Sequence, residues 1–208
     1  MSLYGRLFAR FYDRAIAVSE EAGLADRRRR LLAQARGRVL EIGAGTGLNL
    51  AHYPAGIEQL VLTEPEEPML ARLRARAERH KPSATVVAAP AEQLPLAAAS
   101  VDTVVTTLTL CTVDDLEAAL REAQRVLAPG GRLLFLEHVR AADERLARRQ
   151  DLLAPLWKHL GHGCHCNRAT LAAIEAAGFD VHDVEHGEMP RAPRFLEPLI
   201  AGVALKPS

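Results

Sequence analysis

Cysteine is scarce in this sequence, since the chain of 208 residues has only Cys111, Cys164 and Cys166. Three cysteines, two of them one residue apart, cannot build the disulfide framework that stabilises small secreted domains. The N-terminus also lacks the pattern of a cleavable leader, a charged start followed by a short apolar core. We therefore expect the protein to work in a reducing, cytoplasmic compartment.

Long apolar runs and an excess of charge of one sign are also missing. No stretch approaches the roughly 20 apolar residues that a bilayer-spanning helix needs. Lys and Arg together number 26, and Asp and Glu also number 26, so the formal net charge is zero. A neutral chain is not drawn to nucleic acid by its overall charge. We expect a small-molecule partner, no nucleic acid and no transmembrane segment.

The first 36 residues predict two helices ahead of the main fold. Apolar residues recur at helical spacing from Leu3 to Ile16 with arginines between them, and a second helix is expected from about Ala25 to Ala35. We expect the first helix to pack on its own domain; peripheral contact with a membrane is the alternative, because basic residues flank the apolar stripe. The run from Arg27 to Arg30 is interpreted as a solvated helix face, because no aromatic residue interleaves with it.

Short aliphatic runs then alternate with helical stretches. Strands are expected at Arg38 to Ile42, Glu58 to Thr63, Ala84 to Ala88, Val101 to Thr107 and Arg132 to His138, with helices at Met69 to Arg79 and Asp115 to Leu127. The turn Ala128 to Gly131 should end the second of these helices and lead into the fifth strand. This order is typical of a parallel sheet with right-handed crossovers.

The last part of the chain is predicted to hold one helix and two strands. These are Arg168 to Ala177, closed by Gly178, then Asp180 to His186 and Leu199 to Leu205. No repeat or interdomain linker is apparent. We expect one domain over residues 1–208, with a helical lid over 1–36 and an α/β core over 37–208.

The first core strand runs directly into three alternating glycines, Gly43, Gly45 and Gly47. Glycine is needed where a backbone turns sharply and approaches a ligand closely. A dinucleotide-binding loop reads G-x-G-x-x-G and aims a helix N-terminus at a pyrophosphate, but here the third glycine comes one residue early. The spacing therefore favours S-adenosylmethionine, which has no phosphate, over a nicotinamide cofactor.

Two carboxylates follow the next two strands. Glu64 comes 21 residues after Gly43, where it can accept hydrogen bonds from both ribose hydroxyls. Glu92 follows the third strand and suits the adenine amino group, while Met69 can pack against the ring. Both acids are expected at the carboxyl ends of strands, the edge where open α/β sheets bind ligands.

Together these residues resemble the class I S-adenosylmethionine-dependent methyltransferases. The resemblance lies in Glu41 to Gly47, Glu64, the Ala91-Glu92 pair and the segment from Arg125 to Leu133. It implies a Rossmann-like, doubly wound sheet of seven strands, mostly parallel with an antiparallel last strand. The cofactor residues it implies are Gly43, Ala44, Gly45, Thr46, Gly47, Asn49, Glu64, Pro65, Met69, Ala91, Glu92, Thr107 and Leu108.

A narrower resemblance lies in Pro155 to Arg168, in Ile200 to Ala204 and in Leu136 to Val139. These segments are similar to the methyltransferase-like seven family of thiol S-methyltransferases and its bacterial relatives. The animal members carry a hydrophobic N-terminal anchor that is not recognisable here. The resemblance implies in-line transfer of a methyl group to a small thiol. The alternatives are N- or O-methylation of a lipid headgroup or natural product, and a cofactor-binding regulator without catalysis.

The segment after the fourth strand, Leu108 to Thr112, supports a thiol acceptor. It is mostly apolar, includes Cys111, and replaces the Asn- or Asp-Pro-Pro-aromatic motif with which other methyltransferases hold an amine. A thiol needs only modest help from a base, because its reference pKa is about 8.5. The candidate bases are His138, His162 and His165, since imidazole titrates near neutrality.

The remaining candidates concern enclosure and metal binding. Phe11 and Tyr12 on the first helix, together with Trp157, are expected to enclose the acceptor and exclude water. Between residues 159 and 166, five histidines and cysteines crowd together and suggest zinc. Structural zinc sites usually have two separated ligand pairs, which this chain does not provide, so we expect no metal.

Overall fold

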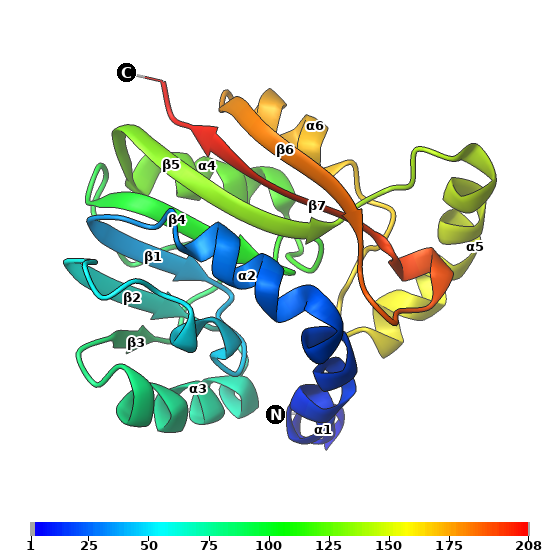
Figure 1. Ribbon diagram of the computed structural model, residues 1–208, viewed down its shortest axis with the longest axis horizontal. Helices are drawn as coiled ribbons and strands as arrows, with labels where there is room; N and C mark the ends of the chain where they lie inside the picture. Colours follow the sequence, from blue (N-terminus) through cyan, green and yellow to red (C-terminus); the bar gives the residue numbers. More distant parts are fainter. Residues whose placement is uncertain (1–2, 208) are drawn as a thin grey trace.

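The computed structural model describes residues 3–207. Its strands are β1 (Arg38–Ile42), β2 (Gln59–Thr63), β3 (Thr85–Val87), β4 (Val101–Thr107), β5 (Leu127–His138), β6 (Asp180–Glu188) and β7 (Pro198–Leu205). They form one sheet in the order β3-β2-β1-β4-β5-β7-β6, which crosses Figure 1 from the lower left to the top. β7 runs antiparallel to β5 and β6, whereas the other neighbours are parallel. The predicted seven-stranded fold is confirmed.

The fifth strand begins five residues earlier than predicted. Leu127 already pairs with Val101, and the register then shifts before Arg132 pairs with Thr103. The glycine-rich turn lies within this irregularity, with Gly130 at a φ of 69°. The turn therefore interrupts the ladder instead of preceding it.

Helices cover both faces of the sheet (Figure 1). They are α1 (Leu3–Ser19), α2 (Ala25–Leu32), α3 (Glu67–His80), α4 (Leu116–Val126), α5 (Glu144–Leu160) and α6 (Thr170–Ala176). A π-helical turn, Glu20–Leu24, joins α1 to α2, and Gly23 bends the chain there at a φ of 127°. Helix α5 was not predicted; it begins where Asp143 accepts a hydrogen bond of 2.8 Å from the Leu146 amide.

Alternation along the strands divides the core into two apolar layers. In β5, Leu134 and Leu136 pack with α2 and α3, while Leu133 and Phe135 pack with α4 and α6. Strands buried on both faces explain the continuous aliphatic runs in the sequence. Because β1, β2, β4 and β5 are parallel, their carboxyl ends meet at one edge, where ligand-binding residues can converge.

Two observations bear on membranes and metals. Among residues 3–207, no helix has both the length and the apolar character required to cross a bilayer. Within the same range, no three His, Cys, Asp or Glu side chains are grouped so that they could hold a metal ion.

Candidate active site

A cavity of about 960 Å³ opens at the carboxyl ends of the strands. Its lining comes from the loop after β1, the ends of β2, β4 and β5, helix α1, and the segment that follows α5. This volume lies at the upper end of the range typical of small-molecule sites. The cavity is therefore large enough for a nucleoside cofactor and a second small molecule.

The three glycines after β1 have different roles, although each has a positive φ. A Cβ on Gly43 would collide with the Thr109 side chain, so this glycine permits close packing of two loops. A Cβ on Gly45 would meet nothing within 4 Å, because this residue faces open space in the cavity lining. Gly47 packs toward Leu50 and Leu73 and is not among the lining residues.

Glu64 is fixed at the end of β2 by the glycine loop. Its carboxylate accepts hydrogen bonds of 2.9 Å from the backbone amides of Gly45 and Glu66. The residue is only 6% exposed, and burial raises the pKa of its carboxyl group. Each carboxylate oxygen can accept a further hydrogen bond, so Glu64 can still bind a ligand hydroxyl.

Most of the predicted site residues line this cavity. They are Gly43, Ala44, Gly45, Thr46, Asn49, Glu64, Pro65, Met69, Ala91, Glu92, Thr107 and Leu108 from the cofactor set, and Tyr12, Cys111, Trp157, His138 and His162 from the acceptor and base sets. Gly47, Phe11 and His165 are not among the lining residues. Phe11 is 48% exposed, and Phe8, one helical turn earlier, lines the cavity in its place.

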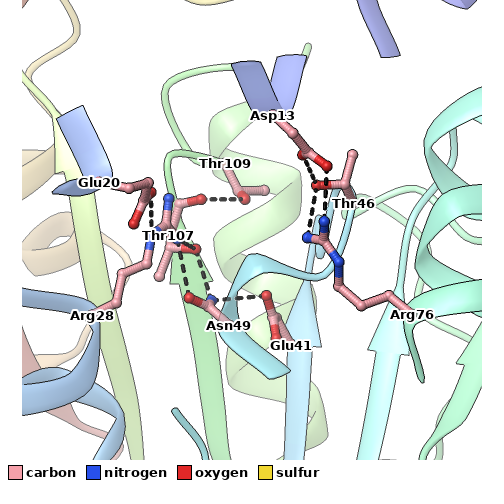
Figure 2. A network of polar contacts seen from close by, with 9 residues as sticks. All are labelled: Asp13, Glu20, Arg28, Glu41, Thr46, Asn49, Arg76, Thr107 and Thr109. Atoms are coloured by element: carbon pink, nitrogen blue, oxygen red, sulfur yellow. Dashed lines mark hydrogen bonds and ion pairs between the residues drawn. The ribbon is translucent and has the colours of Figure 1, made fainter. Parts of the chain in front are cut away.

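Arg28 was not predicted as a site residue, and its assignment to a solvated helix face was wrong. It is 3% exposed and lines the cavity. Its Nη1 donates to Asn49 Oδ1 at 3.0 Å and to Thr107 Oγ1 at 2.8 Å, while Nε pairs with Glu20 at 2.9 Å. Figure 2 shows this guanidinium joining α2 to Asn49, in the segment after β1, and to Thr107 at the end of β4. The run of arginines thus supplies a buried cation to the site.

A buried carboxyl group lies next to this cation. Glu41 accepts hydrogen bonds from Asn49 Nδ2 at 2.8 Å and from the Tyr53 hydroxyl at 2.7 Å. Burial raises its pKa to about 7, although both hydrogen bonds and Arg28 oppose that shift. Glu41 also lines the cavity. Its charge will therefore respond to a charged ligand bound there.

A second polar cluster ties α1 to the glycine loop. Asp13 accepts a hydrogen bond of 2.6 Å from the Thr46 hydroxyl and one of 2.8 Å from Arg76 Nη2 on α3. Figure 2 shows these three side chains on the far side of the loop from Arg28. Asp13 thereby connects α1 both to the glycine loop and to α3.

Another part of the cavity lining is built around sulfur and aromatic groups. The Sγ atoms of Cys111 and Cys164 lie 3.9 Å apart, and both residues line the cavity. Trp157 stands beside them, with its ring centroid 5.6 Å from that of Phe195 in an edge-to-face arrangement. Buried Glu137 holds this wall, because its carboxylate accepts the backbone amides of Thr109 and Cys111 at 3.2 Å. This wall of Cys111, Cys164 and Trp157 belongs to an apolar cluster.

The three candidate histidines occupy different environments. His138 is 7% exposed, and burial lowers its pKa to about 4. His162 lines the cavity; its ring stacks on that of Phe8 with the centroids 4.5 Å apart, and its Nε2 lies 3.8 Å from Glu66 Oε2. Burial lowers the pKa of His165, whose backbone amide donates to the Cys111 carbonyl at 2.7 Å. The three rings are therefore not equivalent as bases.

Comparison with known proteins gives a consistent result. A family model described as a methyltransferase domain matches residues 40–135. Thiol S-methyltransferase TMT1B of Rattus norvegicus is 38% identical over 172 residues, which cover 81% of this chain and 70% of the relative. TMT1B of Homo sapiens is 38% identical over 182 residues, covering 84% of this chain and 74% of the relative. A SAM-dependent methyltransferase structure from Thermotoga maritima matches with a TM-score of 0.68 and 25% identity, over 96% of this chain and 97% of that chain.

Proposed function

Because this chain belongs to the S-adenosylmethionine-dependent methyltransferases, we propose that it transfers the methyl group of this cofactor to the sulfur of a small thiol. The observation that carries the proposal is that two different groups of residues line the same cavity. The loop from Gly43 to Thr46 and Glu64 form one group, and the wall of Cys111, Cys164 and Trp157 forms the other. An apolar, sulfur-rich wall suits a soft thiol better than a charged amine.

The cofactor residues fit a phosphate-free nucleoside. Glu64 would accept the ribose hydroxyls, and Glu92 with Met69 would hold the adenine, since all three residues line the same cavity as Gly45. S-adenosylmethionine supplies a methyl group on a sulfonium, which is electrophilic without further activation. The protein's task is therefore to position the two sulfur atoms and to exclude water.

Arg28 is assigned to the carboxylate at the amino acid end of the cofactor. A guanidinium binds a carboxylate through charge-assisted hydrogen bonds, and Arg28 is already oriented by Glu20, Asn49 and Thr107. Because Arg28 belongs to α2, cofactor binding would also stabilise the helical lid that we propose for residues 1–36. Phe8 and Tyr12 supply the part of this lid that lines the cavity.

The histidines differ in their suitability as bases. Proton transfer from a thiol with a pKa of about 8.5 to His138, at about 4, is uphill by roughly four pKa units. His165 is not in the cavity lining, so His162 is the candidate among the three that best keeps the predicted role. N- or O-methylation is not favoured, because the relatives that cover most of this chain are named thiol S-methyltransferases.

Peripheral membrane contact and a cytoplasmic location stay predictions. Large apolar side chains are exposed on α1 at Leu7, Phe11 and Val18, and on α5 at Leu152, Leu156 and Leu160. They support an apolar surface through which a hydrophobic thiol could approach. The three cysteines are free, which suits a reducing compartment.

The proposal is tested with isotopically labelled S-adenosylmethionine and a panel of thiols, amines and phenols at equal concentration. We expect mass spectrometry to detect labelled thioethers as the main products, above a control without protein. Predominant methylation of amines or phenols, with the thiols unchanged, would contradict a sulfur acceptor.

A further inference from the structure

Two cysteines from distant parts of the sequence meet on the acceptor wall. Cys111 follows β4, and Cys164 lies in the loop after α5. The Cys164 thiol donates a hydrogen bond to Cys111 Sγ, with the two sulfur atoms 3.9 Å apart. Because this contact is direct, no other side chain separates the two sulfur atoms. The pair is therefore placed so that one sulfur can react with the other.

The backbone also holds the two cysteines close to each other. The His165 amide donates to the Cys111 carbonyl at 2.7 Å, so the segments that carry Cys111 and Cys164 lie side by side. Gly163, at a φ of 92°, permits this approach, because a Cβ there would lie only 3.2 Å from the Thr112 carbonyl. A disulfide has sulfur atoms about 2.05 Å apart. Rotation of the two side chains, with a small shift of the loop, would close the remaining gap.

The three cysteines differ in their access to the cavity. Cys164 is 8% exposed and Cys111 is 1% exposed, and both line the cavity. Cys166 is 0% exposed and is not a lining residue. A small molecule in the cavity therefore reaches Cys164 first, with Cys111 in contact with it, while Cys166 is shielded.

We propose that Cys164 and Cys111 form a reversible modification site for a small disulfide, the oxidised form of the acceptor thiol. Cross-linking of the pair stops methyl transfer, a consequence that rests on the proposed function. Cys164 Sγ attacks one sulfur of the small disulfide, a mixed disulfide forms and the first small thiol leaves. Cys111 Sγ then attacks Cys164 Sγ, the protein disulfide forms and the second small thiol leaves. Both protein thiol protons pass to the released thiols, so the protein loses two electrons and the small disulfide gains them.

The cross-link would act on the acceptor side of the cavity. Cys111 is fixed, because buried Glu137 accepts the backbone amides of Thr109 and Cys111 at 3.2 Å. The loop that carries Cys164 and His162 therefore has to move toward the end of β4. A displacement of about 1 Å at a reacting centre can lower a rate about 100-fold. The glycine loop belongs to another part of the chain, so cofactor binding should persist.

This chemistry suits a protein whose acceptor is itself a thiol. In a reducing compartment, protein disulfides are mostly transient and redox-sensing. The pair would stay reduced while small thiols are abundant and would cross-link when they are converted to disulfides. Methyl transfer would then stop when its acceptor is oxidised.

The chemical test uses bis(2-hydroxyethyl) disulfide at about pH 8, close to the ordinary pKa of a thiol. Remaining thiols are blocked with iodoacetamide in denaturant, and the protein is digested without reductant. We expect mass spectrometry to detect a peptide pair linked through Cys111 and Cys164, with Cys166 alkylated. Cys111→Ser should stop at a mixed disulfide of Cys164 with 2-mercaptoethanol. Cys166→Ser, the matched control, should still form the cross-link.

The functional test uses 4-nitrothiophenol as the acceptor, because its thiolate is a good leaving group and so reduces an alkyl disulfide poorly. After removal of the reagent, we expect methyl transfer by the cross-linked protein to be at least about tenfold slower. Tris(2-carboxyethyl)phosphine, which is not a thiol, should restore the rate. Binding of S-adenosylhomocysteine should change less than about threefold. The rate of Cys164→Ser should not respond to the reagent.

Absence of the linked peptide pair after prolonged incubation, or cross-linking of Cys166 as often as of Cys111, would overturn the proposal. An unchanged rate of the cross-linked protein, or equal inhibition of Cys164→Ser, would overturn it as well. Failure of the reduced protein to methylate any thiol would contradict the proposed function instead. The peptide map requires neither cofactor nor variant, so it would still decide whether the pair is a modification site.

Discussion

Replacing Arg28 by methionine should remove the proposed contact with the cofactor carboxylate and leave the contacts with the nucleoside in place. Methionine has a similar reach and no charge, so it removes the donors to Glu20, Asn49 and Thr107. Removing one partner of a buried ion pair costs roughly 3 to 5 kcal/mol. The side chain of Glu20 is 15% exposed and keeps some water. We therefore expect a loss of unfolding free energy near the lower limit, about 3 kcal/mol.

The effect on ligand binding should depend on which ligand is used. A charge-assisted hydrogen bond contributes about 1.5 to 3 kcal/mol, so Arg28→Met should weaken S-adenosylhomocysteine binding about 10- to 100-fold. 5′-Methylthioadenosine has the same nucleoside but no carboxylate, and its affinity should change little. Isothermal calorimetry with both ligands measures the contrast, and urea unfolding measures stability.

The matched control is Arg29→Met on the same helix. The Arg29 side chain is 63% exposed and pairs with Asp26 at 2.9 Å, so its loss should cost less than about 0.5 kcal/mol and leave both affinities unchanged. Unchanged binding of S-adenosylhomocysteine to Arg28→Met would refute the carboxylate assignment. An equal loss for both ligands would refute it too, since Arg28 would then act only on the fold.

Three further predictions concern the loop, the buried acid and the lid. Gly43→Ala should lower the free energy of unfolding in urea by about 2 to 4 kcal/mol, because the strain of a left-handed φ and the collision with Thr109 add together. Gly45→Ala should lower it by only about 1 kcal/mol, and its main effect should be weaker binding of S-adenosylhomocysteine. Equal destabilisation by the two substitutions would contradict this prediction. Folding raises the pKa of Glu41 from 4.5 to about 7, so the unfolded chain loses its proton first and stability falls as pH rises through this window. The stability of Glu41→Gln relative to the unchanged protein should therefore improve by about 3 kcal/mol between pH 4.5 and pH 8, and a difference independent of pH would count against the shift. Phe8→Ala should raise the KM for the thiol about 2- to 10-fold, because it removes the stacking of Phe8 on His162. Phe11→Ala, at an exposed position, should leave this KM unchanged. Identical effects of the two substitutions would argue against the proposed lid.

The central strands could be predicted from the sequence because burial on both faces leaves a simple signal. The observed bounds of β1 and β4, Arg38–Ile42 and Val101–Thr107, equal the predicted ones. Helix α5 was missed although Leu152, Leu156 and Leu160 recur at helical spacing. Pro155 lies inside this helix, at a residue type that normally argues against a helix interior. The three leucines are exposed, so they form no buried stripe.

The cofactor loop was predictable because glycine spacing and strand ends are local features. Arg28 was missed because four consecutive arginines cannot be told apart until it is known which side of the helix faces the core. A signal was present: Arg28 lies four residues after Leu24 and three before Leu31, both buried, and so belongs to the apolar stripe. Likewise, Tyr12 and Phe8 lie four and eight residues before buried Ile16 and so share its side of the helix, whereas Phe11 does not.

The cysteine pair could not be inferred from sequence. Cys111 and Cys164 are separated by 53 residues, and their meeting depends on the docking of the loop after α5 on the end of β4. Such a contact arises from the packing of α5, the element whose existence was itself missed. From the sequence, only Cys111 was assigned to the acceptor wall, and Cys164 was considered only as a possible zinc ligand.

The most direct test of the account is a crystal structure of the protein with S-adenosylhomocysteine and an alkyl thiol. We expect the ribose on Glu64, the carboxylate on Arg28, and the thiol sulfur between the cofactor sulfur and Cys164. A nucleoside bound away from Glu64, or a thiol on a wall that does not include Cys164, would contradict it.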